Sequence, residues 1–141
     1  MDLKLELELV IVPVADVDRA KAFYVEQMGF GLDVDHSAGE SFRVVQLTPP
    51  GSACSIAIGV GISSAEPGSL RGLHLVVTDI VAVRDELVSR GAEVAEVRHM
   101  KAGAWSPGPD PDRTDYNSFA DFTDPDGNTW ILQEKGYVAK G

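Results

Sequence analysis

The chain of 141 residues contains one cysteine, no long apolar run and comparatively few basic residues. A lone Cys54 cannot form an internal disulfide, and no charged-then-apolar leader opens the chain, so we expect a reducing, cytoplasmic location. The longest apolar run, 9–15, contains Pro13 and is much shorter than the roughly 20 residues of a membrane-spanning helix. The sequence therefore predicts neither export nor a membrane segment.

Basic residues are the scarcer charged class, with 12 Lys and Arg against 22 Asp and Glu and a formal net charge of −10. Such a chain repels phosphate backbones and anionic lipids, and no cluster of Lys or Arg offsets this locally. We therefore expect no nucleic-acid or membrane partner. The acidic excess indicates solubility and does not point to a substrate class.

The first half of the chain predicts the element order β-α-β-β-β. Leu alternates with Lys or Glu over residues 3–8 and leads into an apolar stretch at 9–12, as in a half-exposed strand that enters a core. Asp16 stands at the N-cap of a predicted amphipathic helix, and Gly29 ends that helix. Three short strands are predicted to follow, at 31–35, 42–48 and 54–59.

The second half begins in the same way after a linker at 67–70. A strand ends in a second capping residue, Asp79, and the helix that follows it runs to Gly91. Strands are then predicted at 92–100, 117–122 and 129–134. When the halves are aligned so that Asp16 falls on Asp79, Val14 falls on Val77. This internal repeat predicts two modules, 1–66 and 71–141, within one globular domain.

Residues 101–116 are the main departure from this repeat. The stretch contains three prolines, which disfavour both helix and strand, so it is predicted to be a long loop.

Three features together resemble the vicinal oxygen chelate superfamily, which includes glyoxalases, bleomycin-resistance proteins and extradiol dioxygenases. They are the two modules, the segment Val-Ala-Asp-Val-Asp-Arg-Ala-Lys-Ala-Phe-Tyr from Val14 to Tyr24, and the Asp-Pro-Asp-Gly-Asn turn at 124–128. The resemblance covers nearly the whole chain. It implies an α+β fold in which two tandem modules form a cupped sheet that holds a small molecule, and it implies a homodimer, since such relatives are often dimers.

The same resemblance implies a divalent metal held by His, Gln or Glu side chains, but the corresponding positions here carry other residues. The two first-strand ligands fall on Leu9 and Gly72, and the last-strand carboxylate falls on Ile131. None of these three residues offers a side-chain donor to a cation. We therefore expect no metal at the family position and no other cofactor.

His74 and Gln133 are the candidate polar residues of the cup. His74 lies two residues after Gly72, so strand alternation places both on one face. It could act as a general acid or base or donate to a ligand carbonyl; alternatively, it is a histidine satisfied within a half-buried cup. Gln133 shares the face of Ile131 and would supply a neutral donor and acceptor, or would fill space.

Four further residues lie close to the predicted mouth of the cup. Glu134 has the opposite parity and is predicted to be a solvated charge, unless a bulge turns it inward to replace the missing carboxylate. His99 precedes the proline-rich loop and is expected near the mouth. Trp105 and Tyr116 bracket that loop and suit either a lid that stacks on a planar ligand or a pin that fastens the loop to the sheet.

These residues predict a mainly apolar cup lined by Leu9, Ile11, Gly72, His74, Ile131 and Gln133, with Trp105 and Tyr116 on its closing loop. Two functions remain open. The first is a binding module that resembles bleomycin-resistance proteins and sequesters a planar or aromatic small molecule without metal. The second is an enzyme of the lyase, isomerase or dioxygenase class that acts on a small oxygenated substrate, with His74 as acid or base or with a non-standard metal site.

Overall fold

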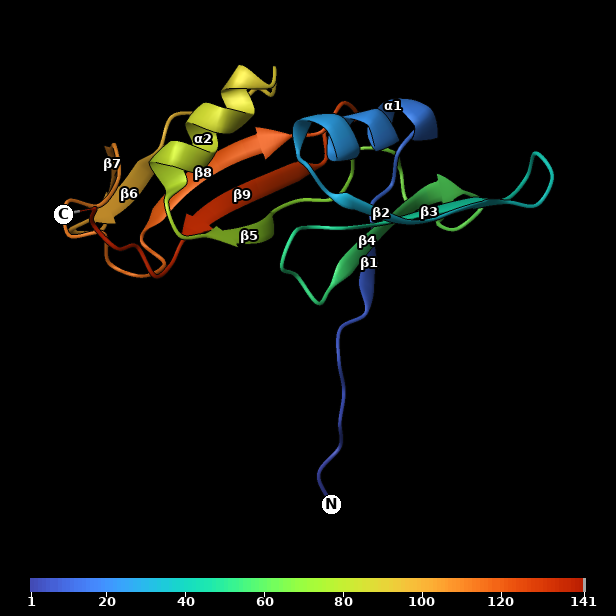
Figure 1. Ribbon diagram of the computed structural model, residues 1–141, viewed down its shortest axis with the longest axis horizontal. Coiled ribbons are helices and arrows are strands. Elements are labelled where there is room, and N and C mark those ends of the chain that lie inside the picture. Colours follow the sequence, from blue (N-terminus) through green and yellow to red (C-terminus); the bar gives the residue numbers. More distant parts are fainter. Residues whose placement is uncertain (141) are drawn as a thin grey trace. The chain divides into compact units, whose positions relative to one another are not determined.

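The computed structural model describes residues 1–140, and the chain divides into two compact units, Met1–Ser69 and a second that begins at Leu70 (Figure 1). Each unit has its own sheet and its own buried apolar side chains. The first core includes Val12, Ala20, Tyr24, Val45, Leu47 and Ile58, and the second includes Ile80, Leu87, Ala120, Phe122, Trp130 and Leu132. Over the described residues, no helix has both the length and the apolar character needed to cross a membrane.

Sheet A belongs to the first unit and has the strand order β1-β4-β3-β2. The strand β1 runs parallel to β4, and the other neighbours are antiparallel. A short helix α1 continues as one π-helical turn, η1, whose Tyr24 is fully buried and stacks on Phe30 at 5.4 Å between ring centroids. The elements are β1 (Leu9–Ile11), α1 (Val17–Ala22), η1 (Phe23–Gln27), β2 (Gly31–Ser37), β3 (Arg43–Thr48) and β4 (Ser55–Val60).

Sheet B belongs to the second unit and has the order β5-β9-β8-β6-β7. Here β5 runs parallel to β9, and the remaining neighbours are antiparallel. The helix α2 lies over β8 and β9 (Figure 1). The elements are β5 (Leu73–Val77), α2 (Ile80–Ser89), β6 (Arg98–Lys101), β7 (Ala104–Pro107), β8 (Ser118–Thr123) and β9 (Thr129–Glu134).

The two units repeat the same local construction, which confirms the predicted two-module α+β fold. In each unit the first strand leads into an Asp that caps the helix, and that strand pairs in parallel with the last strand of the unit. The Asp16 carboxylate accepts from the amide of Arg19 at 3.0 Å, and the Asp79 carboxylate accepts from the amide of Ala82 at 3.1 Å. A side-chain oxygen at the N-cap satisfies an amide that the first helical turn leaves without a partner.

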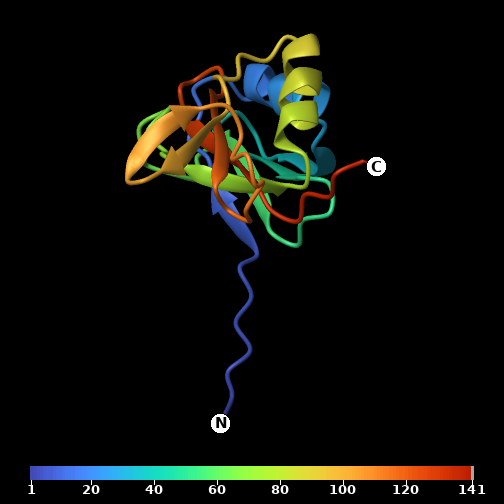
Figure 2. The ribbon, with the colours of Figure 1, turned by 90° about the vertical axis from the view of Figure 1, so that its left-hand side faces the viewer.

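The prediction of a strand over residues 3–8 was wrong. Regular pairing begins only at Leu9, and residues 1–8 extend away from sheet A (Figure 2). Leu3, Leu5 and Leu7 are 70 to 86% exposed. A strand requires a neighbour for its amides and carbonyls, and in the described chain this segment has one only at its end, where Glu8 accepts from the amide of Ser55.

The prediction of an unbroken loop over 101–116 was also wrong, because β6 and β7 form a hairpin there. Its two-residue turn consists of Ala102 and Gly103, whose φ values of 51° and 79° are those that tight hairpin turns require. Pro107 is compatible with the hairpin because it ends β7 at the edge of the sheet. Only residues 108–117 form a loop, and the strand predicted at 92–100 is reduced to β6 and an isolated bridge between Val94 and Phe122.

Removal of the second helix cap is expected to destabilise the fold measurably. The change Asp79→Ala deletes the acceptor for the amide of Ala82 together with a long, 3.5 Å contact to Arg113, and it should lower the free energy of unfolding by about 1 kcal/mol. Asp85→Ala, an exposed position within α2, is the matched control and should change stability by less than about 0.5 kcal/mol. Urea unfolding of both variants measures the difference, and equal losses would contradict the role of the cap.

Candidate functional site

The two faces of sheet B differ because α2 covers only one of them. The covered face carries the buried residues of β8 and β9, namely Ser118, Ala120, Phe122, Trp130, Leu132 and Glu134. Successive side chains of a strand point to opposite faces, so the alternate residues lie on the other side, which we call the open face. There Ile131 lies between His74 of β5 and Asp121 of β8, and Gln133 lies between Val76 and Phe119.

A short chain of hydrogen bonds connects β5, β9 and the loop 108–117 on the open face. His74 Nδ1 lies 2.8 Å from Gln133 Oε1, and Gln133 Nε2 donates to the backbone carbonyl of Tyr116 at 3.0 Å. Tyr116 itself is held by its amide, which donates to the carbonyl of Glu134 at 2.7 Å. His74 and Gln133, which are 59 residues apart in sequence, are therefore direct partners.

An aromatic and charged group occupies the part of the open face near the opposite edge of sheet B. The Trp105 ring meets the Phe119 ring edge to face at 5.4 Å, and the Arg98 guanidinium lies 4.4 Å from the centre of the Trp105 ring. Arg98 also pairs with Asp121 at 3.0 Å. Trp105 remains 52% exposed, so its ring combines a fixed position with accessible surface. It lies on a strand and not on a lid loop.

The structure places the remaining predicted lining residues separately. Gly72 immediately precedes β5. Its backbone N–H donates to both the backbone carbonyl oxygen and the side-chain hydroxyl of Thr129. Leu9 and Ile11 lie on β1 in the first unit, opposite Ser55 and Ala57 of β4. The Tyr116 ring is 48% exposed, and the ammonium group of Lys135 lies 5.3 Å from its centre.

The residues at the family metal positions do not fit a metal ion. Leu9, Gly72 and Ile131 have no donor side chains, and His74 is occupied at Nδ1 by Gln133. Within residues 1–140, no three His, Cys, Asp or Glu side chains gather in an arrangement that could hold a cation. No chemical step through a metal can be assigned to these residues.

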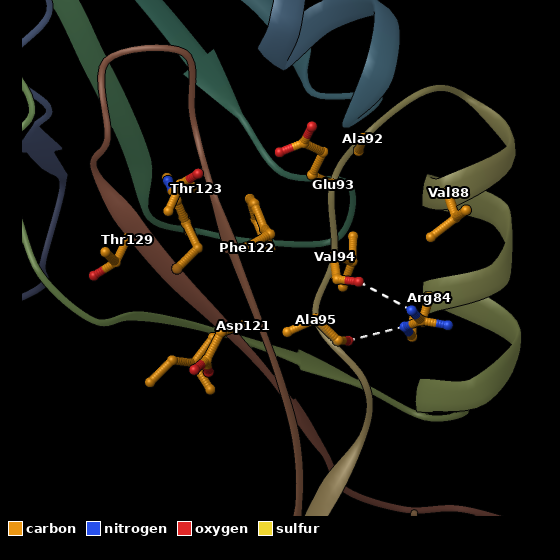
Figure 3. Close-up of a pocket in the computed structure, with 12 residues that line it drawn as sticks. Arg84, Val88, Ala92, Glu93, Val94, Ala95, Asp121, Phe122, Thr123 and Thr129 are labelled. Atoms are coloured by element: carbon orange, nitrogen blue, oxygen red, sulfur yellow. Dashed lines mark hydrogen bonds between the residues drawn. The ribbon is translucent and has the colours of Figure 1, made fainter.

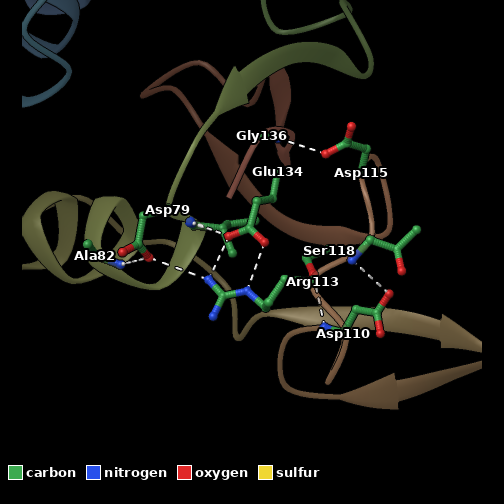
Figure 4. Close-up of polar contacts among 10 residues, drawn as sticks. Asp79, Ala82, Asp110, Arg113, Asp115, Ser118, Glu134 and Gly136 are labelled. Carbon is green, nitrogen blue, oxygen red and sulfur yellow. Dashed lines mark hydrogen bonds and ion pairs between the residues drawn. The ribbon is translucent and has the colours of Figure 1, made fainter. Parts of the chain in front are cut away.

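Glu134 is neither solvated nor turned to the open face, which corrects both expectations for it. Its carboxylate is completely buried on the α2 side of sheet B and accepts from Arg113 Nε at 2.8 Å and from a terminal Arg113 nitrogen at 2.7 Å (Figure 4). It also accepts from the amide of Ile80 at 2.9 Å, in the first turn of α2. The carboxylate raises the pKa of Arg113. Glu134 therefore fastens the loop 108–117 and the start of α2 to β9.

Asp110 stabilises the same loop from its other end. The hydrogen bond from the Asn117 amide group and one from the backbone amide of Asp112 lower the pKa of Asp110 to about 2. The amide of Asp110 in turn donates to the Ser118 hydroxyl at 2.9 Å (Figure 4). With both ends held, the loop presents the Tyr116 carbonyl to Gln133 at a defined position.

His99 does not lie where the sequence predicted, near the mouth of the cup. Its side chain is buried, and its Nδ1 lies 2.7 Å from the carbonyl oxygen of Gly108. In the register of β6 it pairs with Ser118, which belongs to the covered face. His99 therefore supports the loop and does not belong to the open face.

A pocket of about 790 Å³ lies between α2, the segment 92–95 and the ends of β8 and β9 (Figure 3). It is lined by part of α2, the segment 92–95, the end of β8 and the start of β9, and it includes Asp121 and Ile131. Arg84 closes one side by donating to the carbonyls of Val94 at 3.0 Å and Ala95 at 2.9 Å (Figure 3). The lining combines apolar side chains, such as Val88 and Phe122, with polar ones, such as Glu93 and Thr129.

Sequence reasoning missed four residues of the open face: Arg98, Met100, Phe119 and Asp121. Two of them could have been found in the predicted strand at 117–122. Phe119 and Asp121 alternate there with small or apolar residues, which places them together on one face. Arg98 and Met100 depend on the β6–β7 hairpin and its register, in which Met100 pairs with Trp105. The sequence analysis did not predict this hairpin, because the prolines within residues 101–116 indicated a loop.

Comparison with known proteins identifies the family. The sequence model of the Glyoxalase/Bleomycin resistance protein/Dioxygenase superfamily matches residues 7–132. The chain belongs to this superfamily. It is 34% identical to TnmS3, an antibiotic binding protein from Streptomyces sp. CB03234, with a TM-score of 0.74 and coverage of 95% of this chain and 98% of that one.

Two other relatives are similar over nearly their whole length. A glyoxalase/bleomycin resistance protein from the same Streptomyces strain is 35% identical, with a TM-score of 0.69 and coverage of 91% of this chain and 99% of that one. The uncharacterized protein YetH of Bacillus subtilis (strain 168) is 22% identical over 130 residues, which cover 92% of this chain and 98% of YetH. The chain thus spans nearly the full length of these relatives.

Loss of the buried carboxylate is expected to destabilise the second unit strongly. Glu134→Ala leaves the amide of Ile80 without its acceptor and leaves Arg113 with only its 3.5 Å contact to Asp79, and it should cost about 3 kcal/mol in the free energy of unfolding. Glu96→Ala removes a 91% exposed carboxylate that lies 3.4 Å from Arg84 and should cost less than about 0.5 kcal/mol. Equal stability of the two variants in a denaturant titration would contradict the stabilising role of the Glu134 contacts.

Proposed function

We propose that the protein binds a small planar or aromatic molecule on the open face of sheet B, without a metal. The observation that carries the proposal is the position of Trp105, which is half exposed, packed against Phe119 and adjacent to the Arg98 guanidinium. A rigidly held aromatic side chain offers a large contact surface at a low cost in conformational entropy. Planar ligands gain most from such a surface.

The rest of the open face supports this proposal through its chemistry. Ile131, Val76 and Met100 provide apolar surface, while the hydrogen-bonded pair of His74 and Gln133 provides polar groups near the β5 edge. Small-molecule sites typically combine an apolar lining with a few placed polar groups that set orientation.

The comparisons support binding as the function. TnmS3, which is similar along nearly its whole length, is described as an antibiotic binding protein. The metal-free part of the proposal is supported by Leu9, Gly72 and Ile131 at the family metal positions and by the engagement of Glu134 with Arg113. A cytoplasmic location and a homodimer stay predictions from the sequence.

An enzyme that uses His74 as acid or base is the second candidate function. The observation in its favour is the hydrogen bond that orients the imidazole, because a proton-transfer group must be held in position. Turnover of a small oxygenated substrate in the absence of metal, abolished by His74→Phe, would favour this candidate over simple binding.

Truncation of the exposed tryptophan is expected to weaken binding. Trp105→Ala removes the stacking surface and should raise the dissociation constant for fused-ring aromatic compounds about five- to ten-fold, as measured by isothermal titration calorimetry. Phe42→Ala, a partly exposed aromatic of the first unit, is the control and should leave the constant unchanged. Equal affinities for Trp105→Ala and the unaltered protein would reject the open face as the binding surface.

Metal removal is expected to have no effect on binding. Elemental analysis of the purified protein should find less than one equivalent of zinc, iron, nickel or manganese per chain, because the family positions lack donor side chains. Dialysis against a chelator should leave the affinity for aromatic compounds unchanged. One tightly held metal per chain, with binding lost on chelation, would show that the metal-free proposal is wrong.

A further inference from the structure

The orientation of the Gln133 amide is determined by its contact with the Tyr116 carbonyl. The atom 3.0 Å from that carbonyl oxygen must be the amide nitrogen, because a carbonyl oxygen only accepts hydrogen bonds. The opposite orientation would bring two oxygens together. The Tyr116 carbonyl is itself held in place, since the Tyr116 amide donates to Glu134 and the loop is fastened at Arg113.

The fixed amide determines which nitrogen of His74 carries the proton. Gln133 Oε1 has no hydrogen, so the 2.8 Å contact with His74 Nδ1 is a hydrogen bond in which Nδ1 donates. A neutral imidazole has one protonated nitrogen, and the other carries a lone pair. In the neutral state, His74 therefore presents Nε2 as an acceptor and has no donor left for a ligand.

This acceptor is available on the open face. Among residues 1–140, His74 has no polar partner other than Gln133, and its side chain is exposed beside Ile131. The other acceptor of the open face, Asp121, is already paired with Arg98 at 3.0 Å. A ligand that lies over β5 and β9 meets the lone pair of His74 Nε2, and it gains from that contact only if it carries a hydrogen-bond donor.

We infer that His74 Nε2 selects ligands with an aromatic or enolic hydroxyl group, and that Gln133 is the positioning residue that creates this preference. The inference rests on the proposed function, because it assigns a ligand class to the same face. A ketone or an ether in the same place would meet a lone pair and gain nothing. The ligand is therefore a planar hydroxyaromatic molecule and not merely an apolar one.

The first test compares two probes of the same ring system, one with a hydroxyl group and one in which a methyl group replaces the hydroxyl hydrogen. Calorimetry with 2-naphthol and 2-methoxynaphthalene, at about pH 8 where an ordinary imidazole is neutral, should show the naphthol bound about five-fold more tightly. His74→Phe keeps a ring of similar size and should bind the two probes with equal affinity. Gln133→Leu should also reduce the preference, because His74 then has no partner that determines its tautomer.

The second test reads the tautomer directly in the free protein. Proton–nitrogen correlation spectra of the imidazole side chains, with the His74 signals identified by their loss in His74→Phe, should show Nδ1 protonated and Nε2 unprotonated. Gln133→Leu should change these nitrogen shifts. Gln27→Leu, the same substitution at the end of η1 in the first unit, should leave both the shifts and the probe preference unchanged.

The outcomes separate this inference from the proposed function. Equal binding of both probes by the unaltered protein would overturn the hydroxyl preference while leaving aromatic binding intact. A proton on Nε2 in the neutral free protein would overturn the inference whatever the probes show. If neither probe bound at millimolar concentration, the proposed function would fail, and the ligand class inferred from it would fail as well.

Discussion

The parallel pairing of β5 with β9 is the constraint on which the rest of the second unit depends. It brings residues 73–77 alongside residues 130–134, and its register sets Val76 opposite Gln133 and His74 opposite Ile131. This register produces one hydrogen bond on each face of the sheet. On the open face His74 reaches Gln133, and on the covered face Glu134 reaches the amide of Ile80, where α2 begins. A shift of one residue would exchange the faces and abolish both contacts.

The covered face gives the open face its rigidity. Glu134 binds Arg113, and Arg113 belongs to the loop that supplies the Tyr116 carbonyl to Gln133. A buried charge is tolerated because its ion pair and its backbone hydrogen bond replace the lost hydration. The polar group on the open face is thus positioned by contacts made on the opposite side of the sheet, and the loop between them is their physical connection.

The fold could be predicted from the sequence because its signals are local. Asp16 and Asp79 cap helices in the way their positions indicate, and the buried Tyr24 and Trp130 follow the periodicity of their elements. The same reasoning failed for segments whose conformation depends on pairing with a neighbouring strand. Residues 3–8 alternate as a strand does but lack a neighbour to pair with, and Ala102 adopts a positive φ because it stands in a tight turn between paired strands.

The sequence by itself determined the two modules, the Asp-capped helices, the superfamily and the absence of donor side chains at the family metal positions, since these follow from residue identity and short-range spacing. Only the tertiary structure decided that Glu134 is buried against Arg113, that His99 supports a loop, and that Trp105 lies on a strand near Phe119. It also decided that His74 is bonded to Gln133. These contacts join residues up to 59 positions apart, and no local pattern encodes them, because they depend on strand register and on the path of a loop.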